Sequence, residues 1–279
     1  MKIFTTKHEV EQYLQQLQAA GQSIGFVPTM GALHQGHLSL IAQAKQQAGV
    51  VVCSIFVNPT QFTDPNDLEK YPRPIEADIE KLEQAKCDVL FNPPVSEMYA
   101  GNESWHLNIG ELEHLLEGRF RPGHYQGVMQ VVHKLFSIVK PNLAFFGQKD
   151  FQQVMVIGKM VSLLNMPVKL VMCPIEREAD GLAMSSRNIH LTADDRHHAL
   201  VLSKALQQAK AEFNSNQSLN AVKEHAENLI SSEPGTQLEY FEIADGENLH
   251  TATLNSSSIV ALVAARVGST RLIDNVIIR

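Results

Sequence analysis

The sequence predicts an α/β protein in which a parallel sheet with helices on both faces is followed by a smaller α+β domain. Short runs of β-branched and aromatic residues recur along the first 174 residues. Most of these runs are separated by stretches that place apolar residues at three- and four-residue intervals, as a helix with one buried stripe does. Strand and helix alternating in this way indicate a parallel sheet, because the connections must run over its faces.

Five strands and five helices are expected in the first part of the chain. The expected strands are SIGFV (23–27), VVVCSIFV (50–57), CDVLFNP (87–93), NLAFFG (142–147) and VKLVMCP (168–174). The expected helices are EVEQYLQQLQAA (9–20), HLSLIAQAKQQA (37–48), EADIEKLEQAK (76–86), VMQVVHKLFSIVK (128–140) and FQQVMVIGKMVSLL (151–164). In a sheet of this kind, ligands bind beyond the carboxyl ends of the strands.

The pattern of alternating strands and helices ends after Pro174. A polar segment leads into two helical stretches and then into two strand candidates, LEYFEIA and SIVALVAARV. We therefore expect a domain over residues 1–175 and a smaller α+β domain over residues 176–279.

Composition and charge exclude several classes of protein. The formal charge of −7 lacks the basic excess that a nucleic-acid backbone requires, so no nucleic-acid partner is expected. No apolar run approaches the roughly 18 residues of a membrane span, and the first residues lack the apolar centre of a secretory signal, which predicts a cytoplasmic protein. Cys53, Cys87 and Cys173 are odd in number and lie in or beside apolar runs, as buried reduced thiols do.

The segment PTMGALHQGH brings two histidines to the start of a predicted helix. Pro28 is expected to end the preceding strand, Gly31 to permit a tight turn, and the helix to begin near His37. His34 and His37 are three residues apart, so both imidazoles lie on one side of the first turn. The free amides and positive end of the helix favour an anion there, whereas two solvated histidines are the alternative if the spacing is taken alone.

Two further segments carry groups suited to phosphate. In MSSRN (184–188), two hydroxyls and the Arg187 guanidinium could clamp a leaving pyrophosphate. In GQKDFQQ (147–153), Lys149 can reach a phosphate, and Asp150 can cap the helix or accept from a ribose hydroxyl. Each segment alone is also compatible with an ordinary polar loop or helix start.

Two other connections complete the candidate site. The motif NPTQF ends the strongest strand and places Asn58 and Gln61 at the carboxyl edge of the sheet, beside the histidine loop. EGRFRPGHYQG is a long connection before a helix, and connections of that length are often functional. We expect its Arg121 and His124 to lie over the site as a lid.

The order and context of these motifs resemble the pantothenate synthetase family over nearly the whole chain. H-x-G-H after a first parallel strand, with a hydroxyl-rich loop far downstream, is similar to the signature of the nucleotidyltransferase superfamily. The resemblance implies a Rossmann-like first domain and ATP-dependent ligation of pantoate to β-alanine through an enzyme-bound pantoyl adenylate. It further implies Mg²⁺, with no protein ligands assigned to the ion, and a homodimer.

The same resemblance implies roles for individual residues. His37 would donate a proton or stabilise the α-phosphate, with His34 and Lys149 beside it as catalytic groups. The residues it assigns to ATP are Met30, Gly31, Ala32, Leu33, His34, Gln35, Gly36, His37, Gly147, Gln148, Lys149, Asp150, Glu176, Met184, Ser185, Ser186 and Arg187. Those it assigns to pantoate or β-alanine are Asn58, Gln61, Tyr71, Arg121, His124 and Gln153. Among these, the amides of Gln61 and Gln153 can donate to a carboxylate and accept from hydroxyls.

Two positions depart from the family pattern, and three other functions compete with the ligase. Gln148 stands where a Glu is expected, and Glu176 where an apolar or small residue is usual.

The first competing function is nucleotidyl transfer to a phosphorylated acceptor. It would require more Arg and Lys near the acceptor than the amide-bearing segments NPTQF and FQQ provide. A transfer-RNA synthetase is opposed by the net charge, and a silent nucleotide-binding regulator by the complete set of histidine, lysine and serine.

Overall fold

The structure is a computed structural model that describes residues 1–279 except for residues 100, 102 and 215–217. It divides into two compact units. The first comprises residues 1–147 and 152–174, and the second comprises residues 148–151 and 175–279. The chain therefore leaves the first unit at Gly147, contributes four residues to the second unit, and returns before it leaves again at Pro174.

The first unit is built on a six-stranded sheet in which all neighbouring strands are parallel, in the order β1-β4-β3-β2-β5-β6. The strands are β1 (Lys2–Phe4), β2 (Ile24–Thr29), β3 (Val50–Ile55), β4 (Val89–Phe91), β5 (Leu143–Gly147) and β6 (Lys169–Cys173). The helices are α1 (Lys7–Ala19), α2 (Gln35–Gln47), α3 (Pro65–Lys70), α4 (Ile75–Gln84), α5 (Val95–Met98), α6 (Leu116–Phe120), α7 (His124–Val139) and α8 (Phe151–Leu163), with short 3₁₀ turns η1 (Pro59–Gln61) and η2 (Gly110–Glu113).

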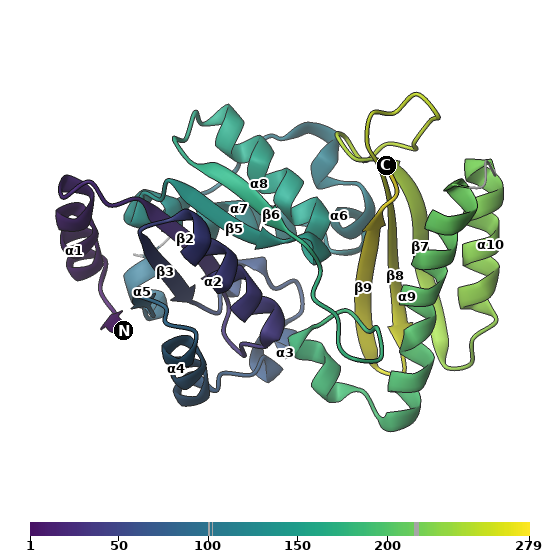
Figure 1. The fold of residues 1–279 in the computed structure, drawn as a ribbon, viewed down its shortest axis with the longest axis horizontal. Helices are drawn as coiled ribbons and strands as arrows, with labels where there is room; N and C mark the ends of the chain where they lie inside the picture. The colour runs from purple at the N-terminus through teal and green to yellow at the C-terminus, as the bar shows by residue number, and fades with distance from the viewer. Residues whose placement is uncertain (100, 102, 215–217) are drawn as a thin grey trace. The chain divides into compact units, whose positions relative to one another are not determined.

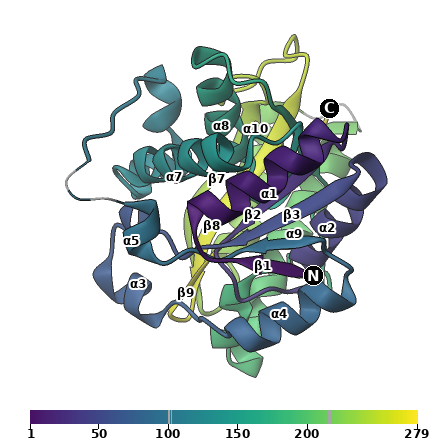
Figure 2. The same cartoon turned by 90° about the vertical axis from the view of Figure 1, so that its left-hand side faces the viewer.

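Helices cover both faces of this sheet, as the alternation of strand and helix predicts. Buried side chains of α1, α7 and α8 form one apolar cluster with the strands, and those of α2 and α4 form another. Figure 2 shows α1 and α7 on one side of β1, β2 and β3, with α4 on the other. Both faces of the sheet are therefore buried, which agrees with the burial of every residue of β3.

The order of strands reverses at β2, which pairs with β3 on one side and with β5 on the other. Phe26 of β2 lies opposite Ala144 of β5, and each strand ends three residues further on, at Thr29 and at Gly147. The histidine loop thus leaves the carboxyl edge at the switch point, where open parallel sheets bind their ligands.

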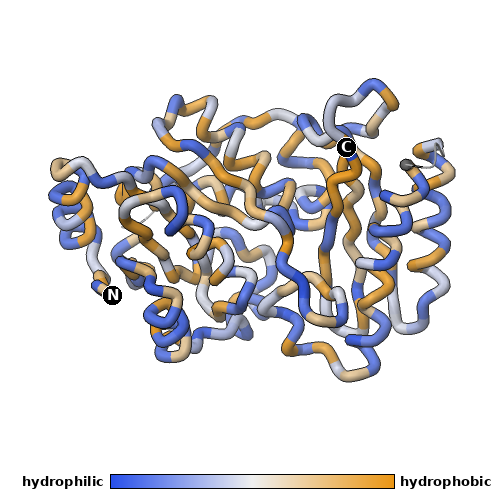
Figure 3. Tube along the Cα trace, in the orientation of Figure 1, coloured by the Kyte–Doolittle hydropathy of each residue, from blue (hydrophilic) through white to orange (hydrophobic). Residues whose placement is uncertain are grey.

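The second unit is a three-stranded antiparallel sheet, β7-β8-β9, with two long helices. Its elements are η3 (Gln148–Asp150), η4 (Ser186–His190), α9 (Ala193–Asn214), α10 (Leu219–Ser231), β7 (Thr236–Asp245), β8 (Ile259–Val267) and β9 (Thr270–Ile277). Helices α9 and α10 pack on this sheet, as Figure 1 shows. The strands form an apolar core with the inner faces of both helices, which Figure 3 shows as orange strands beside helices of mixed colour.

The predicted fold class is confirmed, with additions. The sequence analysis does not predict strands β1 and β9, and β2 continues through Pro28 to Thr29. Helix α2 begins at Gln35 instead of near His37. All three cysteines are buried and unpaired, as expected, and burial raises the pKa of each thiol. Over the described residues, no helix combines the length and the apolarity that crossing a bilayer would need.

Candidate active site

The loop after β2 is held by a carboxylate from helix α4. Asp78 is 1% exposed, and its two oxygens accept the backbone N–H groups of Ala32 and Leu33, each at 2.7 Å. The chain reaches this carboxylate through two residues with left-handed backbone, Gly31 at φ +82° and Ala32 at φ +50°. A side chain on Gly31 would stand 3.0 Å from an Asp78 oxygen, so the close approach requires glycine there.

The two histidines cap helix α2 reciprocally. His34 is the N-cap residue, and its Nδ1 accepts the backbone N–H of Gly36 at 3.1 Å. His37 is the third helical residue, and its Nδ1 accepts the backbone N–H of His34 at 3.3 Å. The two rings lie together, with centroids 4.1 Å apart. This is the geometry of a capping box in which imidazoles take the usual place of Ser and Glu.

This capping determines which ring nitrogens carry protons. A backbone N–H can only donate, so Nδ1 of His34 and Nδ1 of His37 are both acceptors. Each neutral imidazole therefore carries its proton on Nε2. Both rings are donors at Nε2, at a helix N-terminus that already favours negative charge.

Asn58 and Gln61 form the centre of a second polar group in the first unit. Asn58 is 1% exposed; its Nδ2 donates to Gln61 Oε1 at 3.2 Å and to the carbonyl of Gly127 at 3.1 Å. Its Oδ1 accepts the Tyr99 hydroxyl at 2.7 Å. Gln61 Nε2 in turn lies 3.0 Å from Met30 Sδ. These contacts place Gln61 next to the first residue of the histidine loop.

The start of α7 is joined to this group through His124. Its Nε2 lies 3.1 Å from Arg121 Nη1, and its Nδ1 lies 2.8 Å from the carbonyl oxygen of Gln61. Because a guanidinium only donates, Nε2 accepts and Nδ1 carries the proton that is donated to Gln61. His124 is 6% exposed, so this predicted lid residue is packed into the fold where α7 meets η1.

Two other predicted residues of the first unit, Tyr71 and Gln153, lie elsewhere in the fold. Tyr71 is buried, and its ring meets that of Phe62 edge to face, with centroids 5.7 Å apart. Gln153 is half-buried in the first turn of α8. Its neighbour Gln152 is 2% exposed and accepts the N–H of Glu117, which ties α8 to the long connection.

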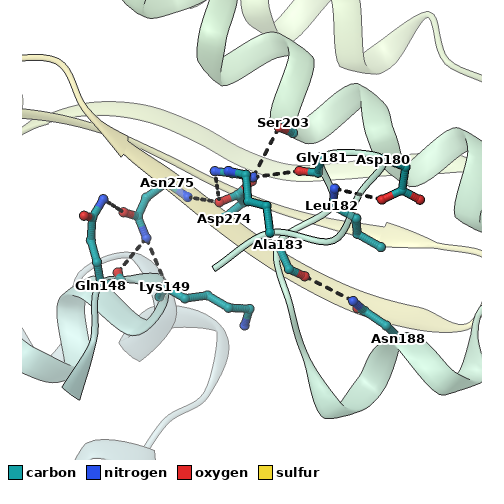
Figure 4. A network of polar contacts seen from close by, with 11 residues as sticks. Gln148, Lys149, Asp180, Gly181, Leu182, Ala183, Asn188, Ser203, Asp274 and Asn275 are labelled. Carbon is teal, nitrogen blue, oxygen red and sulfur yellow. Dashed lines mark hydrogen bonds and ion pairs between the residues drawn. The ribbon is translucent and has the colours of Figure 1, made fainter. Parts of the chain in front are cut away.

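In the second unit, the turn that carries Lys149 is anchored on strand β9. The Nδ2 group of Asn275 donates to the carbonyls of Gln148, at 2.9 Å, and of Lys149, at 3.0 Å. Its Oδ1 accepts from Gln148 Nε2 at 3.0 Å. Figure 4 shows this arrangement, with the Lys149 side chain directed away from Asn275. Asp150 is exposed, and Lys149 is half-buried.

The segment that leads to MSSRN is folded on itself and tied to β9. The N–H of Met184 donates to the carbonyl of Glu176 at 3.0 Å, and Arg177 pairs with Ala183 in an isolated bridge. The Arg177 guanidinium donates to both oxygens of Asp274, at 2.7 and 3.0 Å. The backbone of Glu176 is thus engaged with Met184, while its side chain is exposed.

The hydroxyl-bearing turn η4 is held at its N-terminal cap and at its middle residue. Ser185 caps it by accepting the N–H of Arg187 at 3.2 Å. Asn188 donates to Glu178 Oε1 at 2.7 Å and to the carbonyl of Ala183 at 3.1 Å. Burial raises the pKa of Glu178, but hydrogen bonds from Arg196 and Asn188 and the Arg196 charge outweigh it and hold the pKa below its ordinary value.

The first unit also contains a cavity of about 340 Å³. Trp105, His133 and Lys134 help to line it, and its lining includes none of the residues that the sequence analysis selects. Burial, assisted by the Lys134 charge, lowers the pKa of His133.

Three supporting residues are absent from the sequence-based selection: Asp78, Asp274 and Asn275. Asp78 lies inside an amphipathic helix pattern, and a buried polar position in such a stripe is a signal, although it does not reveal the partner. Asp274 and Asn275 stand together in TRLIDNVI, where two polar residues interrupt an apolar run. Both are at least 95% buried, so each must be satisfied by hydrogen bonds.

The chain is similar over nearly its whole length to one family of proteins. The family model described as pantoate-beta-alanine ligase matches residues 2–277. The pantothenate synthetase of Thermotoga neapolitana is 46% identical over 279 residues, with 100% of both chains covered. That of Bacteroides fragilis is 43% identical over 278 residues, which cover 99% of this chain and 98% of the relative.

Solved structures that match this chain carry the same names as its sequence relatives. The crystal structure of pantothenate synthetase from Thermus thermophilus matches with a TM-score of 0.95 and 39% identity, covering 100% of this chain and 99% of that one. The pantoate-beta-alanine ligase from Francisella tularensis, complexed with beta-gamma ATP and beta-alanine, matches with a TM-score of 0.83 and 38% identity, covering 100% and 98%.

Proposed function

Because the chain belongs to the pantoate-beta-alanine ligase family, its activity is the ATP-dependent ligation of pantoate to β-alanine, and we propose that this ligation passes through an enzyme-bound pantoyl adenylate. The observation that carries the proposal is the histidine pair at the start of α2. Two Nε2–H donors at a positive helix end suit the negative charge of a triphosphate.

The first step is the attack of a pantoate carboxylate oxygen on the α-phosphorus of ATP. A bond forms between that oxygen and phosphorus, the bond to the bridging oxygen breaks, and pyrophosphate leaves with its electron pair. Such a step needs positioning and stabilisation of charge more than a protein nucleophile. In the second step the β-alanine amine attacks the acyl carbon, loses a proton, and AMP departs.

We propose that the following groups bind the triphosphate. His34 and His37 donate from the helix start, with His37 placed for the α-phosphate or for proton donation. Lys149 and Arg187 supply fixed positive charge. The other groups assigned to ATP are Met30, Gly31, Ala32, Leu33, Gln35, Gly36, Gly147, Gln148, Asp150, Glu176, Met184, Ser185 and Ser186. Their support is the arrangement within each unit: the clamped histidine loop in the first, and the anchored turns in the second.

Pantoate binding is assigned to Gln61 and Gln153, with Asn58, Tyr71, Arg121 and His124 around them. Gln61 is 8% exposed and is oriented by Asn58, so its amide is preorganised. A neutral amide leaves the attacking carboxylate less stabilised, and so more reactive, than an arginine fork would. It can also reject analogues that lack the hydroxyls.

The residues present fit a magnesium ion that is carried largely by the nucleotide. In the described part of the chain, no group of three His, Cys, Asp or Glu side chains gathers into a metal cage. Mg²⁺ is commonly held by substrate phosphates and one or two carboxylates, and Asp150 is an exposed carboxylate next to Lys149. When bound, the ion would neutralise charge on the phosphate oxygens.

The decisive experiment is isotope exchange. Purified protein should incorporate labelled pyrophosphate into ATP only when pantoate is present, and should release AMP and pantothenate once β-alanine is added. Exchange without pantoate, or equal exchange with unrelated carboxylic acids, would contradict the adenylate assignment. Omission of Mg²⁺ in the same assay tests the need for the ion.

Two further features are proposed from the family alone. We expect a homodimer, which sedimentation equilibrium of the purified chain would check. We also expect a cytoplasmic location, which fractionation of the cells that make the protein would test.

A further inference from the structure

Strand β9 supports both phosphate-directed turns of the second unit. It contacts η3, which carries Lys149, and η4, which carries Ser186 and Arg187. These two turns are far apart in the sequence, and each is short and irregular. Strand β9 is paired with β8 along its whole length, so it is a more rigid support than either turn provides for itself.

Hydrogen bonds of one amide side chain join β9 to η3. Asn275 is 1% exposed, and both of its N–H groups are used, one on the carbonyl of Gln148 and one on that of Lys149. Its oxygen accepts from the Gln148 side chain. Asparagine supplies two donors and an acceptor on a short stem, and here every part of the amide is directed at the same turn (Figure 4).

These bonds fix the peptide groups on both sides of Lys149 Cα. With the backbone held, the path of the side chain depends only on its own rotamers. A misplacement of about 1 Å in a group that contacts the reacting atoms can lower a rate by ~10²-fold. By fixing the backbone of the turn, the Asn275 amide therefore limits the positions that the Lys149 ammonium can take.

The preceding residue on β9, Asp274, holds the segment that leads to the other turn. Asp274 accepts two hydrogen bonds from Arg177, and Arg177 also donates to the carbonyl of Gly181 at 3.0 Å. The N–H of Asn275 donates to Asp274 Oδ1 at 2.8 Å. Successive side chains of a strand point to opposite faces, so Asp274 holds the 177–181 segment while Asn275 holds the Lys149 turn.

We propose that Asn275 is a positioning residue for the ligation: it orients Lys149 for the ATP phosphates by holding the backbone of the turn. The proposal rests on the assignment of Lys149 to ATP made above. It also gives Gln148 a role of its own, since a glutamine donates to Asn275 Oδ1, whereas a glutamate at that position would set oxygen against oxygen.

The test is a double-mutant cycle on pyrophosphate exchange and on the affinity for a non-hydrolysable ATP analogue. Asn275→Asp is nearly isosteric and removes both donors, and we expect it to lower kcat/KM for ATP by ~10- to 100-fold. In a Lys149→Ala background the same change should cost less than about twofold, because the group it positions is gone. KM for pantoate should be unchanged.

Three results would overturn the proposal. They are equal losses from Asn275→Asp in both backgrounds, a Lys149→Ala enzyme with normal exchange and ATP affinity, and an Asn275→Asp enzyme that behaves as the parent. Pyrophosphate exchange by the parent enzyme that does not depend on pantoate would instead contradict the proposed function. In that case the affinity for the ATP analogue would still measure the coupling between Asn275 and Lys149.

Two controls separate positioning from stability. Asn220→Asp makes the same chemical change at an exposed position on α10 and should leave exchange and urea unfolding unchanged. If the Asn275 variants do not fold, the same double-mutant cycle can be measured with Gln148→Glu, which changes the half-buried partner of Asn275. Its loss should likewise disappear in the Lys149→Ala background, and a loss that persists there would overturn the proposal.

Discussion

Replacing Asp78 tests whether the histidine loop is preorganised by α4. Its buried carboxylate accepts two backbone N–H groups at 2.7 Å, and a hydrogen bond to a charged group contributes about 1.5–3 kcal/mol. The gross contribution is therefore about 3–6 kcal/mol, part of which is offset because the variant no longer buries a carboxylate. We expect Asp78→Ala to lower the free energy of unfolding by about 2–4 kcal/mol.

The same change should affect activity, because Leu33 immediately precedes His34. The left-handed Ala32 is strained and stays in place only while its surroundings hold it, so the loop should relax when the carboxylate is lost. Urea unfolding and pantoate-dependent pyrophosphate exchange measure the two effects, and exchange should fall at least ~10-fold. Asp78→Asn keeps one acceptor, so its stability and exchange rate should lie between those of the parent and of Asp78→Ala. The control is Glu76→Ala, at an exposed position on the same helix. An Asp78→Ala enzyme with parental stability and exchange would refute the reasoning.

Three other predictions follow from single contacts. His37→Ala should lower adenylate formation by ~10²-fold or more in single-turnover kinetics because a donor to the developing charge is lost; the exposed His8→Ala is its control, and unchanged kinetics would exclude the role. Gly127→Ala would set a methyl group 2.6 Å from Gln61 Cα, so KM for pantoate should rise several-fold while ATP affinity is kept, and an unchanged KM would count against Gln61. Because the pKa of Glu178 is lowered in the folded protein, its contribution to stability is present above its ordinary value of 4.5 and is lost as pH falls through the lower folded value. Acid should therefore destabilise the parent more than Glu178→Gln in urea titrations between pH 6 and pH 3, and parallel curves would contradict this.

The local features of the fold could be predicted because each leaves a periodic signal. The apolar stripes of α1, α2, α4, α7 and α8 and the runs of β2 to β6 were visible in the sequence and are confirmed. Strand β1 is only three residues long, too short for a period to show. Strand β9 was missed because its two buried polar residues, Asp274 and Asn275, break the apolar pattern.

The groups that support the site could not be predicted for a different reason. Asp78 reaches backbone groups 45 and 46 residues away, and Asn275 reaches a carbonyl 126 residues away. The sequence around a buried polar residue can show that its side chain needs a partner, but it does not show which distant backbone group that partner is. The candidate site residues could be proposed from the sequence because the loops that carry them have recognisable glycine, proline and histidine spacings.

The excursion of residues 148–151 into the second unit has a consequence for biosynthesis. A chain emerging from the ribosome can form the parallel sheet through β6 while the peptide groups around Lys149 still lack their amide partner. That partner exists only after residue 275 has been translated, so this turn would acquire its final geometry last. A nascent chain stalled between β6 and β9 would then have a folded parallel sheet, while the turn that carries Lys149 would still lack its hydrogen bonds to Asn275.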